Sequence, residues 1–275
     1  MGVGGPIAAV IFDLDGVLID SEPVWERVRR DLVDEYGGHW PDDAQAHLLG
    51  MSTAEWARYL SADLGVNLPS EEVAEVVIDR MAACYADSLP LLPGGGDALQ
   101  RFSARWPLAL ASSSPRRLID SVLAAAGWGE LFEATVSTDE VGRGKPAPDV
   151  YLEAARLLGR SASDCAAVED SSNGMRSAAA AGMLVIAIPR PQYAPAPDAL
   201  KLAALVVPNL RDLTVPAVER LKAAACPGRP GGIGIGRVHR GDGREGLSRP
   251  PQAQPLEGQE RAGRPRPGGA NDGQG

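Results

Sequence analysis

The stretch AVIFDLDGVLIDSEPVW, Ala9–Trp25, begins as a buried strand and ends in acidic residues. Four apolar residues lead into Asp13, and further carboxylates follow at Asp15 and Asp20. Residues two apart in an extended chain point to the same side, so Asp13 and Asp15 can face one small reacting group. Gly16 then allows the sharp turn that follows them. Because crowded carboxylates repel one another, this arrangement indicates a functional site rather than a structural one.

The rest of the first 225 residues alternates strand-like apolar runs with helix-like segments. The expected strands are 7–12, 108–114, 134–138, 165–170 and 184–188, and the expected helices among them are 97–105, 116–126, 149–158 and 175–181. This alternation predicts an α/β fold with a Rossmann-like, doubly wound parallel sheet. A polar, helix-rich block interrupts the series and ends at the Pro- and Gly-rich LPLLPGGG. We therefore expect a catalytic core of 1–21 and 89–225 and an inserted helical cap domain of 22–88.

Residues 226–275 differ in composition from the rest of the chain. Gly and Pro occupy 21 of these positions, and none of them is aromatic. Such a segment cannot bury enough apolar surface to offset its ordering entropy, so we expect a disordered tail. The tail holds eight Arg and five acidic residues, so the first 225 residues carry more negative charge than the net −9 of the whole chain. A body this acidic is not typical of nucleic-acid-binding proteins.

The cysteines and the N-terminus indicate a cytoplasmic protein. Cys84, Cys165 and Cys226 are odd in number and widely spaced, so they form neither a disulfide framework nor a zinc pattern. No Lys or Arg precedes the first apolar run, and Asp13 ends that run too early for a signal peptide or a membrane span. We therefore expect no membrane partner. The sequence does not indicate whether the protein is a monomer.

Polar residues follow four of the expected strands, and the ends of parallel strands share the edge of the sheet where ligands bind. In chain order these residues are Asp13 and Asp15, then Ser112, Ser113 and Ser114, then Lys145, then Glu169 and Asp170. The four carboxylates need a cation, and oxygen ligands suit Mg²⁺ better than zinc, which prefers His and Cys. The serines, with their backbone N–H groups, and the lysine can bind phosphate. Together these groups predict phosphoryl transfer.

The expected reaction is hydrolysis of a small phosphorylated metabolite. Asp13 would attack phosphorus and form an aspartyl-phosphate, while Asp15 would protonate the leaving oxygen and then activate water. Glu22 can bind substrate hydroxyls, or it can begin a helix. Trp25 can form an apolar wall over the substrate's carbon chain, or it can pack inside the cap. The sequence is equally consistent with both readings of each residue.

The order of these motifs resembles that of the haloacid dehalogenase superfamily. The first motif appears as DLDGVL at Asp13, the second as Ser112, the third as Lys145 in GKPAPDVY, and the fourth as Glu169-Asp170 in VEDSSNGM. Within the superfamily the chain resembles the branch of β-phosphoglucomutase and the sugar-phosphate phosphatases, including the hexitol and 2-deoxyglucose-6-phosphate phosphatases. The resemblance implies a helical cap after the first motif. It also implies that Asp13, the backbone carbonyl of Asp15, and Asp170 bind Mg²⁺, supported by Glu169, while Ser112 and Lys145 hold the phosphate.

Three alternatives remain open. A true haloacid dehalogenase needs no metal and lacks the second aspartate, so Asp15 and the acidic pair argue against it. The mutases of this branch have a cap histidine ten residues after the second aspartate and a phosphate-binding arginine three residues after a cap glycine. This chain has Trp25 and Thr53 at those positions, which favours a phosphatase over a mutase. A non-catalytic sugar-phosphate sensor could share the fold but would not need both Asp13 and Asp15.

Overall fold

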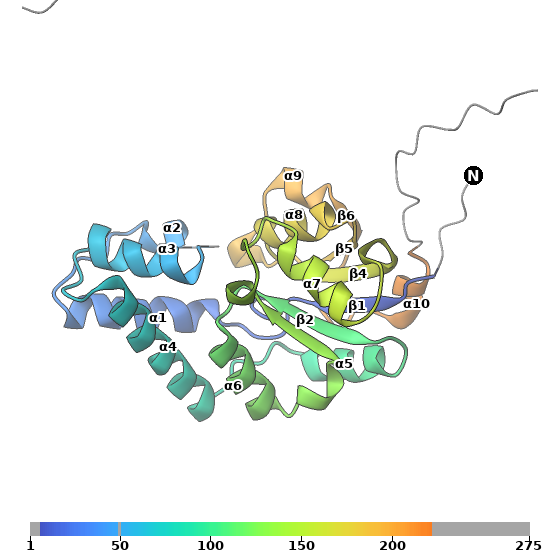
Figure 1. The fold of residues 1–275 in the computed structure, drawn as a ribbon, viewed down its shortest axis with the longest axis horizontal. Helices are drawn as coiled ribbons and strands as arrows, with labels where there is room; N and C mark the ends of the chain where they lie inside the picture. Colours follow the sequence, from blue (N-terminus) through green and yellow to red (C-terminus); the bar gives the residue numbers. More distant parts are fainter. Residues whose placement is uncertain (1–5, 49–50, 222–275) are drawn as a thin grey trace, which may run out of the picture. The chain divides into compact units, whose positions relative to one another are not determined.

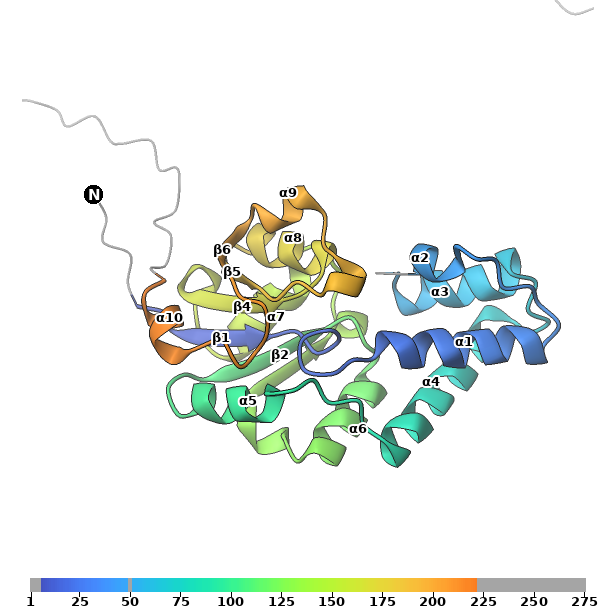
Figure 2. The ribbon, with the colours of Figure 1, turned by 180° about the vertical axis from the view of Figure 1, so that it is seen from behind.

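A six-stranded parallel sheet stands at the centre of the computed structural model, which describes residues 6–48 and 51–221 (Figures 1 and 2). The strand order is β3-β2-β1-β4-β5-β6. The strands are β1 (Ala9–Phe12), β2 (Leu108–Ser112), β3 (Ala134–Ser137), β4 (Cys165–Glu169), β5 (Leu184–Ala187) and β6 (Ala203–Val206). The predicted α/β fold with a Rossmann-like parallel sheet is confirmed.

Helices flank the sheet and fill the long segment between β1 and β2. That segment holds α1 (Glu22–Glu35), α2 (Ala44–Leu48), α3 (Thr53–Arg58), a π-helical turn (Tyr59–Asp63), α4 (Ser70–Asp87) and α5 (Gly95–Ser103). The later helices are α6 (Arg116–Ala126), α7 (Asp149–Leu157), α8 (Ser172–Ala180), α9 (Pro197–Leu200) and α10 (Val215–Glu219). Short 3₁₀ turns lie at Gly129–Leu131, Thr138–Glu140, Ala162–Asp164 and Pro191–Tyr193.

The two faces of β1 pack into two different apolar clusters. Ala9 and Ile11 belong to the cluster that includes α7 and α8, whereas Val10 and Phe12 belong to the one that includes α5 and α6. The ring of Phe12 meets that of Phe102 in α5 edge-on, with centroids 5.9 Å apart. A parallel strand that is buried on both faces has a continuous apolar sequence. This explains why the sequence of this stretch predicted a buried strand.

The helices α1 to α4 lie to one side of the sheet in both views (Figures 1 and 2). Trp56, Leu60 and Leu64, spaced four apart, are all buried, so they form the apolar face of this segment. An ion pair between Asp79 in α4 and Arg117 in α6 joins these helices to the sheet's flank. The described residues belong to one compact unit, and its division into a core and a cap domain stays a prediction.

Three features differ from the sequence-based expectations or lie beyond them. β6 was not expected, and its residues alternate between half-buried and exposed at the edge of the sheet. α8 begins at Ser172, earlier than expected, because the Ser171 hydroxyl caps it by accepting a hydrogen bond from the N–H of Gly174 at 3.0 Å. The predicted disordered tail, 226–275, lies outside the described residues. Within 6–48 and 51–221, every helix is too short or too polar to cross a lipid bilayer.

Candidate active site

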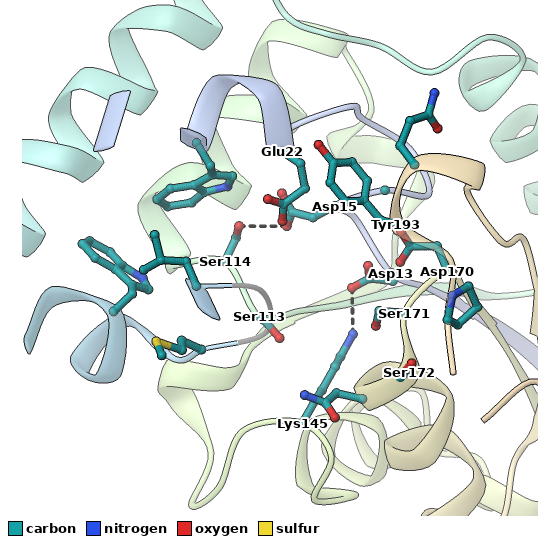
Figure 3. Close-up of a pocket in the computed structure, with 18 of the residues that line it drawn as sticks. Asp13, Asp15, Glu22, Ser113, Ser114, Lys145, Asp170, Ser171, Ser172 and Tyr193 are labelled. Atoms are coloured by element: carbon teal, nitrogen blue, oxygen red, sulfur yellow. Dashed lines mark hydrogen bonds and ion pairs between the residues drawn. The ribbon is translucent and has the colours of Figure 1, made fainter. Parts of the chain in front are cut away.

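Side chains from separate segments of the chain meet at the carboxyl edge of the sheet (Figure 3). β1 lies between β2 and β4, so Asp13, which follows β1, has the ends of both neighbours beside it. Its N–H donates to the carbonyl oxygen of Val168 in β4 at 3.0 Å, which extends the strand pairing up to the site. Ser112 ends β2 and Glu169 ends β4. The order of the strands in the sheet therefore places these residues side by side, independently of contacts between their side chains.

Lys145 connects two of the carboxylates. Its Nζ donates to Oδ1 of Asp13 at 2.7 Å, to Oε1 of Glu169 at 2.6 Å and to the carbonyl oxygen of Ala111 at 3.1 Å. The lysine side chain is only 5% exposed. Burial by itself would lower the pKa of Lys145, but the charges of Asp13 and Glu169 outweigh burial and raise that pKa. The ammonium therefore stays charged and holds both carboxylates in place.

The site contains more buried negative charge than one lysine offsets. Burial is the main cause that raises the pKa of Asp13 to about 8. The positive charge of Lys145 opposes this rise, and the negative charges of Glu169 and Asp15 add to it. Burial, followed by the charges of Glu169 and Asp13, also raises the pKa of Asp170 well above its ordinary value. Each shift reports that the ionised form lacks compensating positive charge in its surroundings. A bound cation would supply that charge.

The arrangement of oxygen atoms fits such a cation. Asp13, Glu169 and Asp170 each offer one carboxylate oxygen, and these atoms lie within 4.8 Å of one another. A set made only of carboxylate oxygens suits a hard divalent ion. The side chain of Asp15 is not in this cluster. The ligand predicted from Asp15 is its backbone carbonyl. These residues can therefore hold a divalent metal ion.

Two serines orient the Asp15 carboxylate. Its Oδ2 accepts hydrogen bonds from the hydroxyl of Ser112 at 3.1 Å and from that of Ser114 at 2.8 Å. Its Oδ1 is buried and has no hydrogen-bond partner among the residues that the structure describes. One carboxylate oxygen is thus held in place while the other keeps its capacity for a proton or a ligand.

Glu169 is enclosed by donors. Its side chain is fully buried, and Oε1 accepts from the hydroxyl of Tyr151 at 2.7 Å as well as from Lys145. Oε2 accepts from the N–H of Asp170 at 3.1 Å, and from the N–H and hydroxyl of Ser171 at 3.2 and 3.1 Å. A buried carboxylate with this many donors is positioned rigidly. It therefore fixes Lys145, which in turn fixes Asp13.

A cavity of about 510 Å³ opens between these groups and the helices α1 to α3. The sheet side of its wall contains Asp13, Asp15, Ser113, Ser114, Lys145 and Asp170. The helical side contains Glu22, Trp25, Arg29, Leu48, Met51 and Trp56, and the loop after β5 adds residues 192–195. Three carboxylates and the lysine line the sheet side of this cavity, and two tryptophans line the helical side. A ligand could therefore place an anionic group and a larger body in one site.

Comparison with known proteins identifies the family. Residues 7–182 match the haloacid dehalogenase-like hydrolases, a span of more than half of the chain. The chain belongs to this family. Hexitol phosphatase B of Escherichia coli is 36% identical over 216 residues, which cover 76% of this chain and 95% of that protein. The bifunctional riboflavin kinase/FMN phosphatase of Arabidopsis thaliana is 34% identical over 184 residues, which cover 66% of this chain and 48% of that enzyme.

The fold is also similar to that of a solved structure. CbbY from Rhodobacter sphaeroides in complex with phosphate has a TM-score of 0.70 at 26% identity, covering 78% of this chain and 100% of that one. The predicted family and its branch of sugar-phosphate phosphatases are confirmed. So is the predicted class of enzyme, a hydrolase of phosphoric monoesters.

All but one of the residues predicted to bind substrate line the cavity, the exception being Ser112. Ser113, Lys145, Glu22 and Trp25 all line it. Ser112 is fully buried behind Asp15 and is absent from the described lining, so its contact with phosphate stays a prediction.

Sequence reasoning placed Ser114 at this edge of the sheet without giving it a role in the site, and it did not expect Arg29 or Trp56 there. All three residues line the cavity. The spacing from Trp25 to Arg29, one helical turn, is the signal that could have found Arg29.

Proposed function

We propose that this hydrolase is a magnesium-dependent phosphatase that cleaves a sugar or sugar-alcohol phosphate through an aspartyl-phosphate on Asp13. The observation that carries the proposal is the environment of the Asp13 carboxylate. It lines the cavity, 2.7 Å from the Lys145 ammonium, and shares a cluster of carboxylate oxygens with Glu169 and Asp170. A nucleophilic carboxylate needs such positive charge beside it, because it must approach an anionic phosphate.

The chain's own residues divide the reaction into two steps. In the first, Asp13 attacks phosphorus, the bond from phosphorus to the ester oxygen breaks, and Asp15 gives its proton to the leaving oxygen. In the second, water attacks the phosphorus of the aspartyl-phosphate, Asp15 takes the water's proton, and Asp13 is regenerated as inorganic phosphate leaves. Ser112 and Ser114 support this role because they hold one oxygen of Asp15 and leave the other unpartnered among the described residues.

Mg²⁺ is the proposed metal because every side chain in the cluster ligates through oxygen. Asp13, Asp170 and the backbone carbonyl of Asp15 would hold it, with Glu169 supporting them. When bound, it would neutralise charge on the phosphate and on Asp13. Lys145 and the N–H groups near Ser113 would bind the remaining phosphate oxygens. The proposed substrate class is supported by the relatives, since hexitol phosphatase B and a fructose-1-phosphate phosphatase, both of Escherichia coli, are named for such compounds.

The test is phosphate release from a panel of sugar and polyol phosphates, with and without Mg²⁺. We expect Mg²⁺-dependent release that falls by at least about 10³-fold in Asp13→Asn, which keeps the shape of the side chain but removes the nucleophile. Asp120→Asn is the matched control, because Asp120 lies on α6 with 62% of its side chain exposed. Equal turnover by Asp13→Asn and the wild type would refute the nucleophile. Conversion of glucose 1-phosphate to the 6-phosphate without net hydrolysis would indicate a mutase instead.

A further inference from the structure

The helical wall of the cavity contains a buried arginine between two tryptophans. The guanidinium of Arg29 lies 4.4 Å from the ring centroid of Trp25 and 5.1 Å from that of Trp56, and all three residues line the cavity. Arg29 is 6% exposed. Its Nε is buried and has no hydrogen-bond partner among the described residues. Buried charges are normally paired, so this guanidinium has donor capacity that the described part of the fold does not use.

A half-buried carboxylate, that of Glu22, shares the same wall. Glu22, Trp25 and Arg29 are spaced by three and four residues, which places them on one face of α1. The Oε2 of Glu22 accepts a hydrogen bond from Nε2 of Gln45 at 2.8 Å, which orients the carboxylate. Burial raises the pKa of Glu22 while the charge of Arg29 opposes that rise. Burial lowers the pKa of Arg29 to about 10, so the guanidinium stays protonated at neutral pH.

These two groups favour one kind of leaving group. A hydroxyl both donates and accepts, so an uncharged hydroxylated chain can accept from Arg29 and donate to Glu22. The flat tryptophan faces can pack against its carbon atoms. A second phosphate would also be attracted to Arg29, but it would bring negative charge close to Glu22 in a desolvated wall, where like charges repel strongly.

We propose that Arg29, with Glu22, selects a leaving group that is uncharged and carries several hydroxyls, and discriminates against one that carries a second phosphate. This specificity rests on the proposed phosphatase function, and it adds the residues that select within the proposed substrate class. Arg29 would contact the leaving group's hydroxyls, whereas the phosphate being cleaved stays with Asp13 and Lys145. Trp25 and Trp56 position the guanidinium as well as covering the carbon chain.

The test compares kcat/KM for three compounds: glucitol 6-phosphate, fructose 1,6-bisphosphate and phenyl phosphate, which has no hydroxyl. We expect the wild type to favour the glucitol phosphate over the bisphosphate by about tenfold or more. Arg29→Met should lower the ratio of kcat/KM for glucitol phosphate to that for phenyl phosphate by about tenfold or more, because hydrogen bonds to a charged donor are lost. The matched control is Arg30→Met, since Arg30 is the next residue of α1, is 51% exposed and pairs with Glu26. It should leave the ratio unchanged.

A second variant protects the test against misfolding of Arg29→Met. Glu22→Gln keeps the shape of the side chain and removes its charge, so the preference for the monophosphate over the bisphosphate should narrow. An unchanged ratio in Arg29→Met, or better turnover of the bisphosphate by the wild type, would overturn the specificity. In either case turnover of phenyl phosphate would leave the phosphatase function standing. Release from none of the three compounds would instead overturn the phosphatase function, and the specificity with it.

Discussion

Replacing Gly174 by alanine tests whether α8 packs against Glu169 as closely as the structure describes. A Cβ built on Gly174 would lie 1.8 Å from Oε1 of Glu169 and 2.1 Å from Oε2. Atoms cannot approach so closely, so the carboxylate of Glu169 or the start of α8 has to move. Both are restrained, because the carboxylate is fully buried and accepts from Lys145, Tyr151 and backbone N–H groups.

Two opposing effects decide the sign of the change in stability. Alanine is favoured over glycine inside a helix by about 1 kcal/mol. Displacing the Glu169 carboxylate would break at least two hydrogen bonds to a charged group, each contributing about 1.5–3 kcal/mol. The net expectation is a loss of about 2–5 kcal/mol in the free energy of unfolding. That is a large share of the roughly 5–15 kcal/mol that stabilises a typical domain.

Urea denaturation followed by circular dichroism measures this loss. The matched control is Gly129→Ala, because a Cβ there meets nothing within 4 Å. Both substitutions restrict the unfolded chain in the same way, so the difference between them isolates the contact with Glu169. We expect the control to stay within about 0.5 kcal/mol of the wild type. If Gly174→Ala were as stable as Gly129→Ala, the close packing of α8 on Glu169 would be wrong.

Two further predictions concern buried groups on the α7 side of the sheet. Tyr151→Phe removes the hydroxyl that donates to Glu169 at 2.7 Å. The substitution should lower the free energy of unfolding, measured by urea denaturation, by about 1.5–3 kcal/mol. A loss under about 0.5 kcal/mol would contradict that hydrogen bond. Burial raises the pKa of the Cys165 thiol to about 11. The thiol therefore stays protonated at pH 8, and its reactive thiolate forms only as the pH approaches 11. Peptide mass mapping at pH 8 should show iodoacetamide labelling Cys165 at least about tenfold faster in urea than in the native protein; equal rates would refute its protection.

Most of the sheet could be predicted from the sequence because its central strands are buried on both faces. The residues of β1, β2 and β4 read as continuous apolar runs bounded by polar residues. β6 was not predicted, because its four apolar residues form so short a run that the sequence does not distinguish a strand from part of a helix. The predicted start of α8 was wrong because its N-cap, Ser171, directly follows the acidic pair Glu169-Asp170 and was taken as part of that motif.

The candidate site could be predicted at the level of residue types but not of contacts. Asp13, Lys145 and Glu169 were expected at one edge of the sheet because each follows a strand. The sequence did not predict that Lys145 bridges the other two residues. It also did not predict that Ser112 faces Asp15 rather than the cavity. Arg29 was missed altogether, because an arginine in a polar helix is usually solvated and only packing against two tryptophans makes it a buried donor.

The sequence by itself determined five of the six strands, the family and the set of chemical groups, because apolar periodicity and short motifs are local properties of the chain. The tertiary structure decided which atoms meet. Lys145 and Asp13 are 132 residues apart in sequence, yet their side chains lie 2.7 Å from each other. Such a contact depends on how strands and helices pack in three dimensions, and no local pattern encodes it. The same holds for Gly174 against Glu169 and for Arg29 between its tryptophans.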